Sequence, residues 1–130
     1  MTTLNTQSNS IDGLADLAQT YFDAAYDMDA DKFAAIFHET STVTRVGENG
    51  SVVVTPIAAW LDTVRAMNSP RQAGVERQDQ IVSINLARNM ALLQLRLRIP
   101  PREVTDLLSC FFINGRWRIA QKVFEAEPLG

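Results

Sequence analysis

The second half of the chain has the hydrophobic pattern of four long β-strands. Leu93, Leu95 and Leu97 alternate with polar side chains, which is typical of a sheet strand with one buried and one wet face. The same reasoning predicts strands at residues 75–86, 90–99, 104–113 and 117–124, separated by short polar or Pro/Gly breaks. Long antiparallel strands with short connections twist and curl, so we expect a strongly curved sheet.

The run at residues 104–113 is apolar on both faces. One face carries Leu107, Phe111 and Ile113. The other face carries Val104, Leu108, Cys110 and Phe112. A strand buried on both sides needs two covers, and the few helices of a small domain supply only one. The second cover is most simply another copy of the chain, which predicts a homodimer formed through the sheet. Asp106 alone interrupts the apolar pattern.

Two helices are predicted before residue 40. Apolar residues recur at helical spacing from Asp12, the expected cap, to about Met28. Asp29 or Asp31 is expected to cap a short second helix over residues 32–37.

A hairpin and a third helix follow. β-Branched runs on either side of a Gly/Asn-rich turn predict a hairpin over residues 42–54. Thr55 as N-cap, with Pro56 at the first helical position, predicts a helix that runs to about Met67.

This order of elements indicates an α+β fold. We expect three N-terminal helices packed on the concave face of a strongly curved, mainly antiparallel sheet. Residues 1–10 are polar and are expected to be disordered or frayed, and residues 11–127 to form a single domain.

Composition narrows the classes of partner. The chain of 130 residues has a net charge of −3 and no run of Lys or Arg, so a nucleic-acid partner is not expected. Cys110 is the only cysteine, which excludes an internal disulfide and suits a reducing compartment. The start of the chain lacks the pattern of a signal peptide, and no apolar run approaches the roughly 20 residues of a spanning helix. We therefore expect a cytoplasmic protein without a membrane partner.

Metal and cofactor sites are not expected either. Metal sites gather several His, Cys or carboxylate ligands, and His38 is the only histidine. The sequence also has no Gly-rich phosphate loop and no nucleophile elbow.

Local strings at both ends of the chain carry a family resemblance. The opening contains Tyr21-Phe22-Asp23-Ala24, then Asp29-Ala30-Asp31 and Phe37-His38. The ending contains Thr105-Asp106-Leu107-Leu108-Ser109 and Asn114-Gly115-Arg116-Trp117-Arg118-Ile119-Ala120-Gln121-Lys122-Val123-Phe124. These strings resemble the nuclear transport factor 2-like, or SnoaL-like, superfamily with its cystatin-like α+β cone, and within it the branch named "putative lumazine-binding". The match spans almost the whole chain.

The resemblance implies a conical fold with a deep apolar cavity and dimerisation through the sheet. The wider superfamily includes ketosteroid isomerase, scytalone dehydratase, limonene epoxide hydrolase, polyketide cyclases and many non-catalytic members. Function is therefore not settled by the fold.

Two candidate residues follow from comparison with ketosteroid isomerase. Tyr21 matches its catalytic helix tyrosine and could donate a hydrogen bond to a developing oxyanion, or it could be a core tyrosine on the apolar stripe of its helix. The position of the general base falls at Arg45, which stays protonated and cannot abstract a proton. An arginine at the mouth of the cavity would instead suit an anionic ligand.

Asp106 and His38 are the candidate acid and base. Asp106 shares the face of Leu108, so desolvation would raise its pKa if that face lines the cavity; alternatively it pairs with an arginine from residues 96–102 at the rim. His38 could transfer protons near neutral pH, or it could cap a helix end. The two together across a cavity would form a minimal acid/base dyad.

Two functions of different class are consistent with these residues. The first is a small-molecule-binding homodimer whose apolar cavity holds a small apolar or aromatic ligand. The second is a cofactor-independent isomerase, dehydratase or cyclase that uses Asp106 and His38 as acid and base and Tyr21 as hydrogen-bond donor. The expected ligand-binding residues are Tyr21, Phe37, Arg45, Trp60, Met67, Leu108 and Phe112.

Overall fold

A computed structural model of the protein describes residues 7–129. The elements are α1 (Ile11–Asp27), α2 (Ala30–Ile36), β1 (Phe37–Val46), β2 (Val52–Pro56), α3 (Ile57–Ala66), β3 (Asp79–Ala87), β4 (Met90–Ile99), β5 (Arg102–Ile113) and β6 (Arg116–Pro128).

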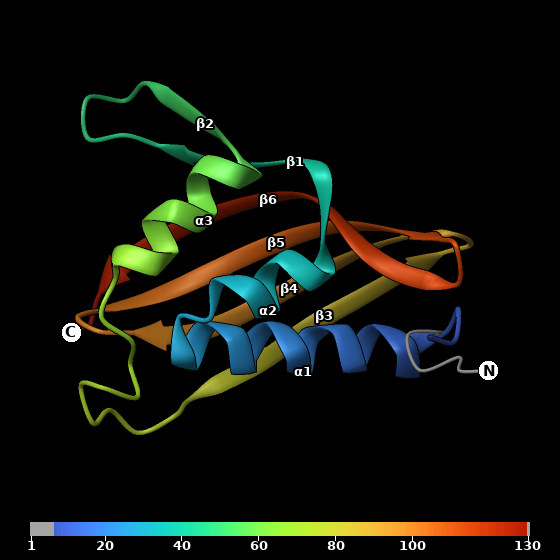
Figure 1. Ribbon diagram of the computed structural model, residues 1–130, viewed down its shortest axis with the longest axis horizontal. Coiled ribbons are helices and arrows are strands. Elements are labelled where there is room, and N and C mark those ends of the chain that lie inside the picture. The colour runs from blue at the N-terminus through green and yellow to red at the C-terminus, as the bar shows by residue number, and fades with distance from the viewer. Residues whose placement is uncertain (1–6, 130) are drawn as a thin grey trace.

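The strands form one curved sheet in the order β2-β1-β6-β5-β4-β3 (Figure 1). β3 pairs antiparallel with β4, β4 with β5, and β5 with β6, and β1 pairs antiparallel with β2. The β1–β2 hairpin joins the meander by a parallel pairing of β1 with β6. The prediction of a mainly antiparallel sheet is confirmed, and β4 has the range that its alternating leucines predict.

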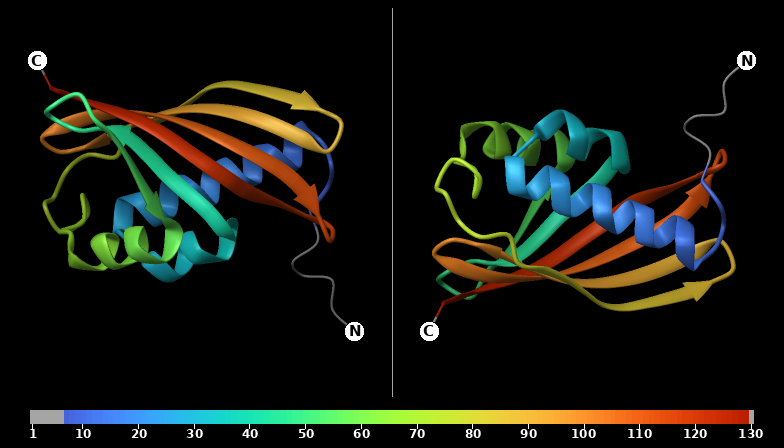
Figure 2. Two further views of the ribbon diagram at one scale, coloured as in Figure 1. Left: turned by 90° about the horizontal axis from the view of Figure 1, so that it is seen from above. Right: turned by 90° about the horizontal axis from the view of Figure 1, so that it is seen from below.

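All three helices lie on one face of the sheet, as the two views of Figure 2 show. α1 packs against β3, β4 and β6, and α3 packs against β1 and β2. The leucines that β4 and β5 direct toward the helices, including Leu93, Leu95 and Leu108, are fully buried. The predicted α+β architecture, with helices on the concave face, is therefore confirmed.

The turn between β5 and β6 has the two residues expected of a tight hairpin. Asn114 and Gly115 both have positive φ, at 53° and 77°. Asn and Gly tolerate this conformation better than other residues, and it matches the twist of the strands that the turn connects.

Besides β3, which begins at Asp79 and not at residue 75, two predicted helix ends are wrong. Phe37 starts β1 instead of ending α2, because its chain pairs with Ile119 of β6. Thr55 and Pro56 belong to β2, where Thr55 pairs with Val43, and α3 begins one residue later without a side-chain cap. In both cases strand pairing outweighs a local helical signal.

The start of α1 also differs from its prediction. Ser10, not Asp12, is the N-cap, and its side chain accepts a hydrogen bond from the backbone of Gly13. Of the expected frayed start, residues 1–6 lie outside the described residues. Gln7 donates a backbone hydrogen bond to Gly115 at 2.7 Å, which ties this end of the chain to the β5–β6 turn.

Candidate functional site

Three polar side chains lie buried between α1 and the sheet: Tyr21 of α1, Asp106 of β5 and Lys122 of β6. We call them the buried trio. The Tyr21 hydroxyl donates a hydrogen bond of 2.7 Å to Asp106 Oδ2, and Lys122 Nζ lies 3.8 Å from Asp106 Oδ1. Tyr21 and Asp106 are each 1% exposed and Lys122 is 6% exposed. Charged side chains are seldom buried this deeply unless they are paired.

A bulge in β6 puts Lys122 on this face. The pairing of β6 with β5 shifts register between Ser109 and Cys110, whose partners are Gln121 and Ile119. Without the extra residue, Lys122 would point away from the helices, opposite to Trp117 and Ile119. The bulge reverses the alternation, so Lys122 points inward.

Aromatic rings surround the ammonium group of Lys122. Its Nζ atom lies 4.4 Å from the ring centroid of Trp60, 4.9 Å from that of Phe124 and 5.4 Å from that of Tyr21. The negative faces of these rings attract the cation and replace part of its lost hydration.

Burial dominates the acid–base properties of the buried trio. It raises the pKa of Asp106, against the opposing effects of the Lys122 charge and the Tyr21 hydrogen bond. It lowers the pKa of Lys122, against the opposing effect of Asp106. Burial and the adjacent carboxylate both raise the pKa of Tyr21, so its hydroxyl keeps its proton and stays a donor.

One oxygen of Asp106 has no hydrogen-bond partner. Asp106 Oδ1 is buried and accepts no hydrogen bond from any described residue, and its nearest cation, Lys122 Nζ, is beyond hydrogen-bond distance. Among the described residues, Asp106 forms its ion pair with Lys122 and not with one of the arginines expected at the rim. Of these arginines, Arg96 has its Nε atom 3.7 Å from Glu103 Oε1. A buried acceptor without a donor is costly, so this oxygen marks a place where a ligand or water would bind.

The buried trio lines one of two adjoining pockets, which we together call the cavity. The inner pocket has a volume of about 120 Å³, and its walls include Tyr21, Phe33, Trp60, Asp106, Lys122 and Phe124. The outer pocket has a volume of about 600 Å³. Both pockets are bordered by Trp60, Met67, Ile99, Val104 and Phe124, so the two adjoin, and we refer to the outer pocket as the entrance.

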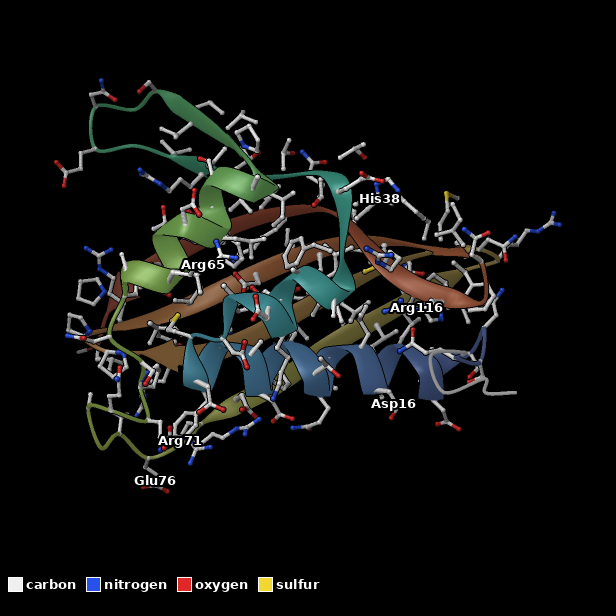
Figure 3. All side chains as sticks on the ribbon, in the orientation of Figure 1. Asp16, His38, Arg65, Arg71, Glu76 and Arg116 are labelled. Carbon is white, nitrogen blue, oxygen red and sulfur yellow. The ribbon has the colours of Figure 1, made fainter. Side chains whose placement is uncertain are left out.

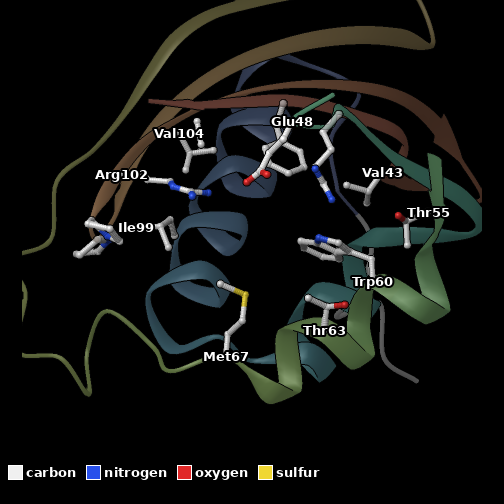
Figure 4. A pocket seen from close by; sticks show the side chains of 14 residues that line it. Val43, Glu48, Thr55, Trp60, Thr63, Met67, Ile99, Arg102 and Val104 are labelled. Carbon is white, nitrogen blue, oxygen red and sulfur yellow. The ribbon is translucent and has the colours of Figure 1, made fainter. Parts of the chain in front are cut away.

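The entrance is more polar than the inner pocket. Figure 4 shows Trp60 and Thr63 of α3, together with Met67 just after this helix, facing Ile99 and Arg102 across the opening. Arg45 and Glu48, from the β1–β2 hairpin, also line it. The cavity is therefore apolar and aromatic along its walls, with charges at its entrance and at its inner end.

Five of the residues expected at a site lie along this cavity. Tyr21, Asp106, Trp60 and Met67 line the inner pocket, and Arg45 lines the outer one. Phe37, Leu108 and Phe112, which were also expected to bind a ligand, line neither pocket. Phe37 stacks in the aromatic core against Phe33 and Trp60, Leu108 is fully buried, and Phe112 packs edge-on against Trp117.

His38 is not part of this cavity. It lines a separate polar hollow with Glu39, Arg116 and Arg118. Its Nδ1 atom lies 2.8 Å from the Thr40 hydroxyl, and Figure 3 shows its side chain on the outer side of β1, away from α1. The structure does not bring His38 and Asp106 together, so the expected acid/base dyad lacks the geometry that it requires.

The sequence analysis did not identify Lys122. Strict alternation along residues 117–124 places it among the solvent-facing positions, as expected for a lysine. The one available signal is that the residues beside it, Val123 and Phe124, are apolar.

The described part of the chain contains neither a metal-binding cluster nor a membrane-spanning helix. Residues 7–129 contain no group of three or more His, Cys, Asp or Glu side chains placed to hold a metal ion. No helix within that range is both long and apolar enough to cross a membrane.

The comparison with protein families decides the relationship. Residues 9–125 match the family described as "Putative lumazine-binding". The chain belongs to this family. The buried trio and both pockets lie within the matched range, except for Ala126 of the outer pocket. No protein with a curated function matches the sequence.

Solved structures share the fold of this family member. An NTF2-like protein of unknown function from Shewanella baltica OS155 has a TM-score of 0.83 at 17% identity, covering 92% of this chain and 94% of that one. An NTF2-like protein of unknown function from Silicibacter pomeroyi DSS-3 has a TM-score of 0.78 at 22% identity, covering 90% of this chain and 95% of that one. A ketosteroid isomerase-like protein from Erwinia carotovora atroseptica has a TM-score of 0.69 at 10% identity, covering 91% and 96%. At these identities the likeness shows an NTF2-like fold alone.

Proposed function

We propose that the protein binds a small, mostly apolar aromatic molecule in the inner pocket and holds it through Asp106 and Lys122. The observation that carries this proposal is the buried, incompletely hydrogen-bonded ion pair at the inner end of an aromatic cavity. Burying two charges costs several kcal/mol unless their remaining hydrogen-bonding positions are satisfied. A ligand that satisfies them gains both specificity and binding energy.

The polar atoms of the pair define the edge of the ligand. Asp106 Oδ1 is free to accept a hydrogen bond from a ligand and Lys122 Nζ can donate one, and the two atoms lie 3.8 Å apart. A ring that carries a carbonyl next to an N–H meets both atoms, with the carbonyl directed at Lys122 and the N–H at Asp106. Lactams and cyclic imides carry such an edge, and so does lumazine, a pteridinedione. The description of the family supports the same ligand class.

The dimensions of the cavity support a ligand that extends beyond one ring. Ligand sites commonly measure roughly 300–1,000 Å³. The inner pocket, at about 120 Å³, is smaller than this, whereas the outer pocket of about 600 Å³ lies within the range. The ring would occupy the inner pocket, and its substituents would extend between Arg45 and Arg102 of the entrance.

We also propose that two copies pair through the convex face of the sheet. Leu107 and Val123 are register partners on that face and are 37% and 41% exposed. Leu92 of the neighbouring strand is 43% exposed. Contiguous exposed apolar side chains of this kind favour a protein interface.

The cytoplasmic location expected from the single cysteine stays a prediction.

A cofactor-independent isomerase or lyase is a second candidate, favoured by one observation. Asp106 is a buried carboxyl group with a raised pKa at the wall of a cavity, as a general base would be. His38 would not take part, because it lines a different hollow, and Tyr21 donates to Asp106 instead of to a substrate. Exchange of a ligand C–H for deuterium in D₂O, followed by NMR, would favour the enzyme, and its absence would favour binding alone.

Calorimetric titration with lumazine tests the binding proposal. We expect lumazine to bind, and 1,3-dimethyllumazine, in which both ring N–H groups are methylated and none is left for Asp106, to bind at least about tenfold more weakly. Asp106→Asn should weaken the binding of lumazine to a similar degree, while the matched control His38→Gln should leave the binding of lumazine unchanged. Equal affinity for the two compounds, or no binding of either, would contradict the proposed recognition.

A further inference from the structure

The buried cation of the site is one of very few lysines. Of the twelve Lys and Arg residues, only Lys32 and Lys122 are lysines. Arginine cannot lose its proton in a protein, whereas a buried lysine readily can, and its neutral amine is a nucleophile. The one buried cation on the cavity wall is therefore of the type that can react.

The geometry leaves the Lys122 amine free to react. Its distance to Asp106 Oδ1, 3.8 Å, is too long for a hydrogen bond, so the carboxylate neutralises the charge without occupying the nitrogen. The other neighbours of Nζ are the rings of Trp60, Phe124 and Tyr21, which offer no hydrogen bond to hold the amine in place. Lys122 also lines the inner pocket, so a ligand there would contact it.

We propose that Lys122 forms an imine with small aromatic aldehydes and ketones that enter the inner pocket. The proposal deepens the function given above and rests on it, because the ligand carbonyl directed at Lys122 is the group that reacts. A lactam or imide carbonyl, which is a poor electrophile, would only accept a hydrogen bond. An aldehyde in the same position would be captured covalently.

The reaction needs only the pair and the ligand. It begins from the neutral form of the pair, in which Lys122 is an amine and Asp106 a carboxylic acid. With the proton on the carboxyl, the lone pair of Nζ attacks the carbonyl carbon, and Asp106 gives its proton to the carbonyl oxygen. The resulting carbinolamine loses a nitrogen-bound proton and its hydroxyl group as water, with Asp106 carrying the proton from nitrogen to oxygen. One C=N bond replaces the C=O bond, one water leaves, and no oxidant or reductant is used.

Burial supports this distribution of the proton. It lowers the pKa of Lys122 and raises that of Asp106, and both directions favour the neutral amine beside the neutral acid. The Tyr21 hydroxyl, held on Asp106 Oδ2, keeps the carboxyl in place with Oδ1 toward Lys122. The low polarity of the inner pocket also limits hydrolysis of the imine, because few water molecules reach it.

Reductive trapping of the full chain tests the proposal directly. The protein is incubated with benzaldehyde near neutral pH, reduced with cyanoborohydride, and digested for mass spectrometry. Of the two lysines, we expect Lys122 to carry the benzyl group, formed at least about tenfold faster than on Lys32, because a lowered pKa increases the neutral fraction of the amine. Lys32, on the surface helix α2, is an internal control that requires no variant. Equal labelling of both lysines, or labelling of Lys32 alone, would overturn the proposal.

Variants and a second ligand separate this result from that of the proposed function. Lys122→Met should abolish the fast labelling, and Lys32→Met should leave it unchanged. If lumazine binds but benzaldehyde does not label Lys122, imine formation is wrong and the binding proposal stands. If Lys122 is labelled but lumazine does not bind, the imine stands and the proposed lactam recognition is wrong.

Discussion

Replacing Lys122 with methionine gives the sharpest test of how the site is built. Methionine has a similar length and packs in apolar surroundings, so Lys122→Met removes the charge with little loss of packing. The change leaves Asp106, which is 1% exposed, without a cation. Loss of one partner of a buried ion pair typically costs about 3–5 kcal/mol because the other charge stays buried.

The cost has an upper limit that depends on pH. Asp106 can take up a proton instead of remaining as an isolated charge. Protonating a carboxyl group with an unfolded pKa of about 3.9 costs about 4 kcal/mol at pH 7 and about 1.5 kcal/mol at pH 5. We therefore expect Lys122→Met to lower the free energy of unfolding by about 3–4 kcal/mol at pH 7.

The sign of the pH dependence follows from the direction of the pKa shifts. The pKa of Asp106 is already raised, and loss of Lys122, which lowers it, raises it further. A group with a raised pKa in the folded state contributes its stabilisation below its unfolded pKa and loses it as pH rises through the folded pKa. The variant is therefore least destabilised near pH 4 and most destabilised above the raised pKa of Asp106. In the unmodified protein, acid protonates Asp106 and leaves Lys122 unpaired. The unmodified protein is therefore also destabilised by acid, and its free energy of unfolding comes closer to that of the variant.

Urea denaturation between pH 5 and pH 8, followed by tryptophan fluorescence, measures these free energies. The double variant Asp106→Asn/Lys122→Met should recover most of the loss, because asparagine still accepts from Tyr21 and carries no charge. The matched control Lys32→Met should stay within about 0.5 kcal/mol of the unmodified protein. A deficit that does not change with pH, or that the double variant does not relieve, would refute the reasoning.

Four further outcomes are expected. Tyr21→Phe should lower stability at pH 7 by about 2 kcal/mol in urea denaturation, because Asp106 loses its 2.7 Å donor. Trp60→Ala should abolish lumazine binding by calorimetry, since Trp60 borders both pockets. His38→Gln should leave binding and the labelling of Lys122 unchanged, as measured by the same titration and trapping. Leu107→Glu should convert a dimer to a monomer in sedimentation velocity, with Gln19→Glu on the outer face of α1 as the control.

The pattern of apolar and polar residues determined the fold class. The alternation around Leu93 and Leu95 predicts a strand with one buried face, and the structure buries both residues. The Asn114-Gly115 pair predicts a tight turn, and the structure has one. These features depend on residues close together in the sequence, so a single sequence contains the information needed to predict them.

The sequence identified part of the cavity as well. Asp106 is visible as the one carboxylate in an apolar strand, and its burial and raised pKa agree with the expectation that its face is turned to the interior. Tyr21 is visible as a helix tyrosine on an apolar stripe. That the two side chains meet through a 2.7 Å hydrogen bond, across 85 positions of sequence, is decided by how α1 packs on the sheet.

Tertiary structure alone decided the rest of the site. One extra residue in β6 reverses the alternation and turns Lys122 inward, and pairing of β1 with β6 converts Phe37 from helix to strand and leaves His38 outside the cavity. Local periodicity reports which face of an element is apolar. It does not report where strands slip in register or which faces meet, because those outcomes depend on the packing of segments that are distant in the sequence.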